Sequence, residues 1–219
     1  MNVRLLQLAS PALPVGAYSY SQGLEAAVEA GIVHDAGTAA RWIGDVFALS
    51  VVGMEAPLLL RLVGAWESND EERVRRWNDE LIASRETAEL RAEALQMGYS
   101  LRRLVGELGV DGAPALEAFD ELAYPTAFAF TVAAWHIDAR EALAAHLFTW
   151  IENQVLAAVK TVPLGQTQGQ RILLDLAQRI PHAVEAAAAM GDDDLSNLAP
   201  GLALASARHE TQYSRIFRS

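Results

Sequence analysis

Apolar side chains recur every three or four positions along most of the chain, which is the spacing of an amphipathic α-helix. Runs in which Val, Ile or Thr alternates with polar residues, as in a half-buried strand, are nearly absent. Glycine and proline stand mostly between the periodic stretches, where they interrupt helices. The pattern predicts an all-α protein that folds as a single-domain helical bundle of about eight to ten helices.

Local signals place the first helix boundaries. Ser19 and Gln22 have the spacing of a capping box, which predicts a helix from there to about Ala30. Gly31 then provides a stop, because glycine readily adopts the left-handed conformation that ends many helices. The residues before Pro11 are expected to be partly disordered.

The middle of the chain contains longer periodic stretches. Gly53 and Pro57 predict a break in the apolar stretch around them, because proline cannot donate a helical hydrogen bond. Residues 71–108 predict the longest helix of the fold. Asp138 is predicted to cap a further helix that reaches about Lys160.

Two apolar stretches, residues 49–66 and 143–159, are too polar to cross a membrane. Glu55 lies in the first, and His146 and Glu152 lie in the second, whereas a membrane span needs about 20 residues with few or no charges. Both stretches are therefore expected to be helices buried inside the protein. No signal peptide is visible, so the expected location is the cytoplasm.

The composition narrows the function classes. Hydrophobic residues make up 52% of the 219 residues and charged residues 21%, which is typical of a globular protein. The formal charge of −11 repels phosphate groups, so neither nucleic acid nor a membrane surface is expected as a partner. The chain contains no cysteine, which excludes disulfides, thiol catalysis and thiolate metal sites.

None of the common catalytic motifs is complete. GxxxxGK[ST], GxGxxG and GxSxG do not occur, and His209 with Glu210 begins like HExxH, but Tyr213 stands where the second histidine belongs. No two of the five histidines lie three or four residues apart, so none is expected to be a metal ligand. Residues 192–194, all aspartate, are expected to form a solvated turn. We therefore predict no catalytic residue, no cofactor and no metal site, and a protein that acts by binding other proteins.

Three stretches resemble the UreF family of urease accessory proteins. They are residues 5–25 (LLQLASPALPVGAYSYSQGLE), 152–166 (ENQVLAAVKTVPLGQ) and 205–219 (ASARHETQYSRIFRS). Residues 84–91 (SRETAELR) are a weaker match. The matches follow one another in the family's order from one end of the chain to the other. One departure is visible, because the family commonly has two glycines after Pro-Val and the second is Ala17 here.

The resemblance implies a function as well as an all-α fold. Proteins that resemble UreF form homodimers and bind a second accessory protein, UreD (also called UreH). Together these two recruit the nickel-carrying GTPase UreG to apo-urease. GTP hydrolysis is then coupled to nickel delivery and metallocentre assembly. The resemblance thus implies a cytoplasmic nickel-insertion chaperone that is not itself an enzyme.

The resemblance and the residue types together suggest the partner-binding positions. Residues 202–219 are expected to form a partner-binding C-terminal tail that contacts UreD, because aromatic and arginine side chains are enriched in interface hot spots. The alternative is a tail that packs on its own domain. The side chains expected to make this contact are Arg208, Tyr213, Arg215, Phe217 and Arg218.

A second set is expected on the UreG side. Lys160 is the only lysine and precedes the VPLGQ loop, a neighbourhood that the family links to UreG. Its alternative role is to stabilise the dipole at the end of its helix. Tyr18, Ser19, Gly23 and Glu25 complete this set, with a structural or dimer contact as the other interpretation.

Three other functions compete with the scaffold. A strict GTPase-activating protein would donate an arginine finger to UreG, with Arg208 or Arg215 as the candidates. An Arg→Lys change would then abolish hydrolysis and leave complex formation intact, whereas in a scaffold binding itself would be lost. A nickel-storage chaperone is disfavoured because cysteine and paired histidines are absent. An uncharacterised helical enzyme is the third alternative.

Overall fold

The computed structural model describes residues 2–219. Three consecutive elements, α3, the π-helical segment η2 and α4, form one continuous helix, Ala36–Glu67. Counted in this way, and without the short 3-10 segments, the described residues form ten helices and no strand. The prediction of an all-α, single-domain bundle is confirmed. The elements are α1 (Val3–Leu8), η1 (Ala17–Ser19), α2 (Leu24–Glu29), α3 (Ala36–Val46), η2 (Phe47–Glu55), α4 (Ala56–Glu67), α5 (Glu71–Ala83), α6 (Ala88–Glu107), η3 (Ala113–Ala118), α7 (Tyr124–Ala134), α8 (Ala139–Thr161), α9 (Gln166–Ala177), α10 (Ile180–Ala189), η4 (Asp192–Asp194) and α11 (Pro200–His209).

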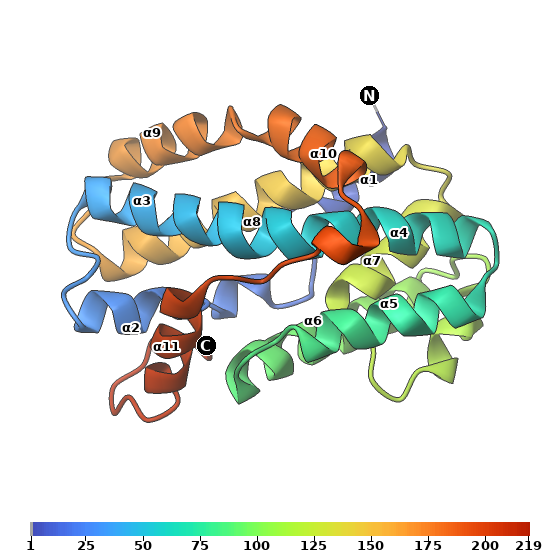
Figure 1. Cartoon of the computed structure of the whole chain (residues 1–219), viewed down its shortest axis with the longest axis horizontal. Coiled ribbons are helices and arrows are strands. Elements are labelled where there is room, and N and C mark those ends of the chain that lie inside the picture. Colours follow the sequence, from blue (N-terminus) through green and yellow to red (C-terminus); the bar gives the residue numbers. More distant parts are fainter. Residues whose placement is uncertain (1) are drawn as a thin grey trace.

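The core is built around α7 and α8. Every residue from Pro125 to Ala133 is buried, because α7 packs against α4, α6 and α8. Figure 1 shows α8 running behind α3, with α9 and α10 along one side of the molecule and α5 and α6 along the other. Asp138 accepts hydrogen bonds from the backbone N–H groups of Arg140 (3.0 Å) and Glu141 (2.9 Å), which confirms the predicted N-cap of α8.

The predicted break at Gly53 and Pro57 is wrong, because the chain passes through it as a π-helix. Pro57 has no N–H to donate to the carbonyl of Gly53, and the N–H of Ser196 bonds that carbonyl instead (3.0 Å). A side chain at position 53 would collide with the carbonyl of Ser196, so the close approach requires glycine. The continuous helix Ala36–Glu67 is long and apolar enough to cross a membrane by length and composition alone, but 67% of its apolar window is buried inside the protein.

The predicted single helix over residues 71–108 is also wrong. It divides into α5 and α6, and the longest helix among the described residues is the continuous helix Ala36–Glu67, with 32 residues. The side-chain oxygen of Thr87 accepts the N–H of Leu90 (3.2 Å) and so begins α6. Asn197 donates to the carbonyl of Ser84 (2.7 Å) at the end of α5. Local caps and a loop contact therefore override the continuous helical periodicity.

The N-terminal region differs from the prediction in two respects. Val3–Leu8 form helix α1, where partial disorder was expected. The capping box at Ser19 does not form, because Gln22 (φ 50°) and Gly23 (φ 74°) adopt left-handed conformations and α2 begins only at Leu24. Gly31 has φ 71° and follows the end of α2, as predicted.

Candidate functional site

The C-terminal stretch folds back along the N-terminal motif, so the two sets of predicted partner-binding residues lie together. The backbone N–H of Arg218 donates to the carbonyl of Ser19 (2.8 Å), and the N–H of Ser21 donates to the carbonyl of Ser219 (2.8 Å). Ser219 is fully buried and Phe217 is 5% exposed. In Figure 1 the end of the chain lies beside α11, in the part of the molecule that also holds α2.

Glu25 holds the backbone of the tail. Its carboxylate is buried and accepts the N–H groups of Ile216 (2.7 Å) and Phe217 (2.9 Å). Gly23 allows α11 to approach α2 closely, because a Cβ there would lie 3.0 Å from the backbone nitrogen of Ser206. Glu25 and Gly23 therefore act from inside the contact between the N-terminal motif and the tail, and not from its outer face.

His209 joins the tail to two helices. Its Nδ1 lies 2.7 Å from Glu89 on α6 and its Nε2 lies 3.2 Å from Glu25 on α2, and its side chain is fully buried. The second oxygen of Glu89 accepts a hydrogen bond from Arg215 (2.7 Å). Both ring nitrogens thus face carboxylate oxygens, so His209 bridges Glu25 and Glu89. Two carboxylates, one imidazole and one guanidinium therefore form a single connected cluster.

Lys160 brings the third resembling stretch to the same place. It lies in the last turn of α8 and its Nζ is 5.4 Å from the centre of the Phe217 ring, a cation–π geometry. The lysine is exposed, whereas the ring is buried. Ala17 lies in η1 without a positive φ, so the absence of the family's second glycine is not a strain on the backbone there.

The side chains of this region divide into an inner and an outer group. Phe217, His209 and Glu25 point inward, so part of the tail packs on its own domain. Three large side chains are strongly exposed, namely Tyr213 (104%), Ile216 (68%) and Tyr18 (65%). The exposed cations beside them are Lys160, Arg208, Arg215 and Arg218. We use the term tail surface for the exposed members Tyr18, Lys160, Arg208, Tyr213, Arg215, Ile216 and Arg218.

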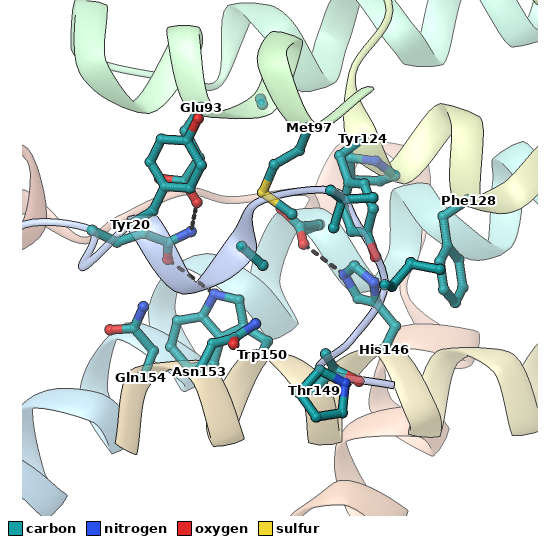
Figure 2. Close-up of a pocket in the computed structure, with 18 of the residues that line it drawn as sticks. Tyr20, Glu93, Met97, Tyr124, Phe128, His146, Thr149, Trp150, Asn153 and Gln154 are labelled. Atoms are coloured by element: carbon teal, nitrogen blue, oxygen red, sulfur yellow. Dashed lines mark hydrogen bonds and ion pairs between the residues drawn. The ribbon is translucent and has the colours of Figure 1, made fainter. Parts of the chain in front are cut away.

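A pocket lies next to the tail and was not predicted from the sequence. It has a volume of about 70 Å³ and lies between α6 and α8, beneath the segment that precedes α2 (Figure 2). Gln22 crosses one end, where its amide nitrogen donates to Glu93 (2.6 Å) and its oxygen accepts the indole N–H of Trp150 (2.9 Å). The hydroxyl of Ser219 donates to the other oxygen of Glu93 (2.8 Å), so the tail holds a residue of the pocket wall.

The charges at this end of the pocket are poorly compensated. Burial raises the pKa of Glu93 to about 7, although the hydrogen bonds from Gln22 and Ser219 oppose this. Burial and the neighbouring Glu93 also raise the pKa of Tyr20, against the effect of Arg218. Glu93 therefore titrates near neutral pH, and its ionised form lacks a cation in direct contact.

The other end of the pocket holds a compensated cluster (Figure 2). Glu55, at the end of η2, forms an ion pair with Arg85 and lies 2.8 Å from Nε2 of His146. Burial acts to raise the pKa of Glu55, but Arg85 and His146 lower it to about 2. Burial raises the pKa of Tyr124, whose ring stacks on His146 at 5.9 Å.

Neither cluster resembles a metal site. Among residues 2–219 there is no group of three or more His, Asp or Glu side chains placed to hold a metal ion. The weak match of residues 84–91 contains Arg85 of one cluster, and the matches 5–25 and 205–219 contain Gln22 and Ser219 of the other. The ion pairs themselves join residues far apart in the chain, so no local pattern announces them.

These features define an all-helical protein in which residues 18–25 and the C-terminal stretch meet in one connected region. Residues 33–177 match the family model of UreF, and the chain belongs to this family. A urease accessory protein UreF of Azoarcus sp. (strain BH72) is 57% identical over 222 residues, covering 99% of this chain and 95% of that protein. The UreF of Methylobacillus flagellatus is 52% identical over 220 residues (99% and 97%), and that of Dechloromonas aromatica 50% over 220 residues (99% and 96%). The chain is therefore a urease accessory protein and not urease itself.

Proposed function

We propose that this protein is the scaffold of urease metallocentre assembly. Together with UreD it recruits the GTPase UreG to apo-urease and couples GTP hydrolysis to nickel delivery. One observation carries the proposal: the residues that the family resemblance assigns to two different partners form a single connected region. A protein whose task is to hold two partners in a functional relation needs adjacent contact sites of this kind.

The contacts within this region supply a route for coupling. Phe217 of the tail touches Lys160 and its N–H bonds Glu25, while Arg218 bonds the carbonyl of Ser19. A partner that moves the tail therefore changes the surroundings of Lys160, Ser19 and Glu25. Linkage requires the reverse as well, so binding on the UreG side biases the tail.

The tail surface has the chemistry of an interface. Tyr213 and Ile216 expose large apolar areas beside arginines, and tyrosine and arginine are enriched among residues that dominate binding energy. The acidic character of the whole chain, with a formal charge of −11, favours the approach of Ni²⁺ to the assembly. We further expect the protein to be a cytoplasmic homodimer that binds UreD, UreG and apo-urease.

A strict GTPase-activating role is the second candidate. Arg215 is engaged by Glu89, whereas Arg208 is exposed and makes no salt bridge within residues 2–219. Arg208 is therefore the better candidate for an arginine finger. An Arg208→Lys variant that still assembles with UreD and UreG but loses most GTP hydrolysis would support this role. Loss of assembly would support the scaffold.

The main test is a pull-down of UreD and UreG with variants of exposed tail residues. A chain ending at Ala205 would not separate binding from folding, because it also removes the buried His209, Phe217 and Ser219. Tyr213→Ala combined with Ile216→Ala alters only exposed side chains. We expect this double variant to keep its helical circular dichroism and to lose both partners.

The matched control is Leu174→Ala, which removes a similarly exposed apolar side chain (64%) from α9. The control should retain both partners. Full retention of UreD and UreG by the double variant would contradict the proposal. The tail would then be only a packing element.

A further inference from the structure

Three glutamates that contact the tail point inward. The carboxylates of Glu25 and Glu89 are 8% and 14% exposed, and Glu93 is 7% exposed. Each is hydrogen-bonded to the tail. Glu25 accepts the N–H groups of Ile216 and Phe217. Glu89 bonds the side chains of His209 and Arg215, and Glu93 accepts the hydroxyl of Ser219. Their negative charge is therefore turned away from solvent and largely used within the protein.

The cations of the same region point outward. Lys160, Arg208 and Arg218 are exposed and form no salt bridge within residues 2–219. Residues 205–219 contain a single acidic residue, Glu210, and its carboxylate accepts the N–H of Ala88 (3.2 Å). The charged members of the tail surface are consequently all cationic, on a protein whose formal charge is −11.

We propose that the tail surface recognises an acidic face of a partner protein, with apolar hollows in that face that receive Tyr213 and Ile216. This inference rests on the proposed function, since it specifies the chemistry of the partner that the tail binds. An acidic partner is repelled by the net charge of this protein and attracted by the exposed cations of the tail surface. The charge pattern therefore selects one orientation of docking and disfavours others.

The inner carboxylates are part of the same arrangement. Exposed glutamates at these positions would neutralise the arginines and remove the attraction. Because Glu25 and Glu89 are turned inward and bonded to His209 and Arg215, they do not pair with the outer cations Lys160, Arg208 and Arg218, which stay available to an approaching partner. Nucleic acid and anionic membranes fit less well, because their extended negative surfaces would also meet the acidic remainder of the protein.

The test measures the affinity for UreD at about 50 mM and about 500 mM salt, where screening of exposed charges differs strongly. The reversal variant carries Arg208→Glu and Arg218→Glu, and the neutral variant carries Arg208→Gln and Arg218→Gln. The matched control is Arg73→Glu, an exposed arginine in the first turn of α5 that makes no salt bridge within residues 2–219.

At low salt we expect about 100-fold weaker binding for the reversal variant, about tenfold for the neutral variant, and less than about threefold for the control. At high salt the difference between reversal and neutral variants should shrink to a fewfold effect. Unchanged amide hydrogen exchange at Ile216 and Phe217 would show that the tail remains docked in every variant.

Two results would overturn the inference, and they bear differently on the proposed function. Equal affinity of the reversal and neutral variants at low salt, with Tyr213→Ala still defective, would leave the scaffold in place and exclude an acidic partner face. Tight binding of the native protein to vesicles of anionic lipid, lost in the reversal variant, would assign the patch to a membrane. If neither the charge variants nor Tyr213→Ala affect UreD binding, the proposed function fails as well.

Discussion

Each end of the pocket holds one buried carboxylate, and the pKa values of the two are shifted in opposite directions. Burial favours the protonated form of both Glu55 and Glu93. Arg85 and His146 nevertheless lower the pKa of Glu55 to about 2, whereas Glu93 meets only neutral donors and has its pKa raised to about 7. The charge of the neighbours, and not burial itself, therefore decides whether the ionised form of a buried carboxylate stabilises or destabilises the fold at neutral pH.

The largest expected effect comes from removing the compensation of Glu55. Arg85→Met leaves a buried carboxylate whose remaining partner is His146, and we expect a loss of about 3–5 kcal/mol in the free energy of unfolding. Urea denaturation at pH 7 measures this loss. The control is Arg103→Met, which breaks an exposed pair with Glu107 and should cost less than about 1 kcal/mol. Equal losses in the two variants would mean that Glu55 does not depend on Arg85 more than an exposed carboxylate depends on its partner.

The second prediction concerns the uncompensated end. Because the pKa of Glu93 is raised from 4.5 to about 7, the folded state binds this proton more tightly than the unfolded state. Its contribution to stability is therefore fully present below about pH 4.5 and declines as the pH rises to about 7, by roughly 3 kcal/mol in all. Glu93→Gln should remove this part of the pH dependence, because a glutamine can accept from Gln22 and donate to the hydroxyl of Ser219.

Urea denaturation between pH 4.5 and pH 8.5 tests the prediction. The variant should become more stable than the native protein as the pH rises. Glu107→Gln, at an exposed position, serves as the control and should follow the native protein closely. A constant difference between the native protein and Glu93→Gln over the whole range would show that Glu93 does not titrate there.

The third prediction concerns the tail cluster, where His209 bonds Glu25 and Glu89. His209→Gln retains a donor for one carboxylate and leaves the other without its partner, so we expect a loss of about 2 kcal/mol, confined mainly to the tail. Amide hydrogen exchange should become faster at Ile216 and Phe217, whose N–H groups bond Glu25. His182→Gln, at an exposed position on α10, should change neither amide. Unchanged protection in the His209 variant would mean that Glu25 alone holds the tail.

Sequence periodicity was sufficient for the fold class and for most helices, because burying an apolar stripe is a local requirement of each helix. Asp138 capped α8 as predicted, since an N-cap involves only neighbouring residues. The errors at Gly53, Pro57 and residues 71–108 have a common origin. In each case a loop far away in sequence supplies hydrogen bonds, from Ser196 to Gly53 and from Asn197 to Ser84.

In the candidate site, too, the local motifs were predicted and the contacts between distant segments were not. Family resemblance marked the tail and the N-terminal motif, but it assigned them to separate partners. Their meeting depends on Glu25 and His209, which are 184 residues apart in the chain, and on the contact of Lys160 with Phe217. Pairings over such distances have no signature in a single sequence, and the HExxH comparison gave no hint that His209 bridges two glutamates.

The smallest effect expected is the difference between two glycine variants in the backbone near the contact of residues 18–25 with the tail. Gly23 and Gly16 both have positive φ, 74° and 81°, but only Gly23 lies against another segment, where an added Cβ would be 3.0 Å from the nitrogen of Ser206 and 3.2 Å from the Cβ of Ala205. Both alanine variants therefore carry the conformational cost of about 1 kcal/mol, and Gly23→Ala should lose about 1 kcal/mol more because α2 and α11 must separate.

Urea denaturation measures both losses, and hydrogen exchange at Phe217 distinguishes them. Gly23→Ala should expose this amide, because displacement of α11 moves His209 away from Glu25, while Gly16→Ala should leave it protected. Identical behaviour of the two variants would mean that the contact between α2 and α11 adapts without strain. The position of the tail would then depend on the charged cluster alone, and the effect of His209→Gln should be correspondingly larger.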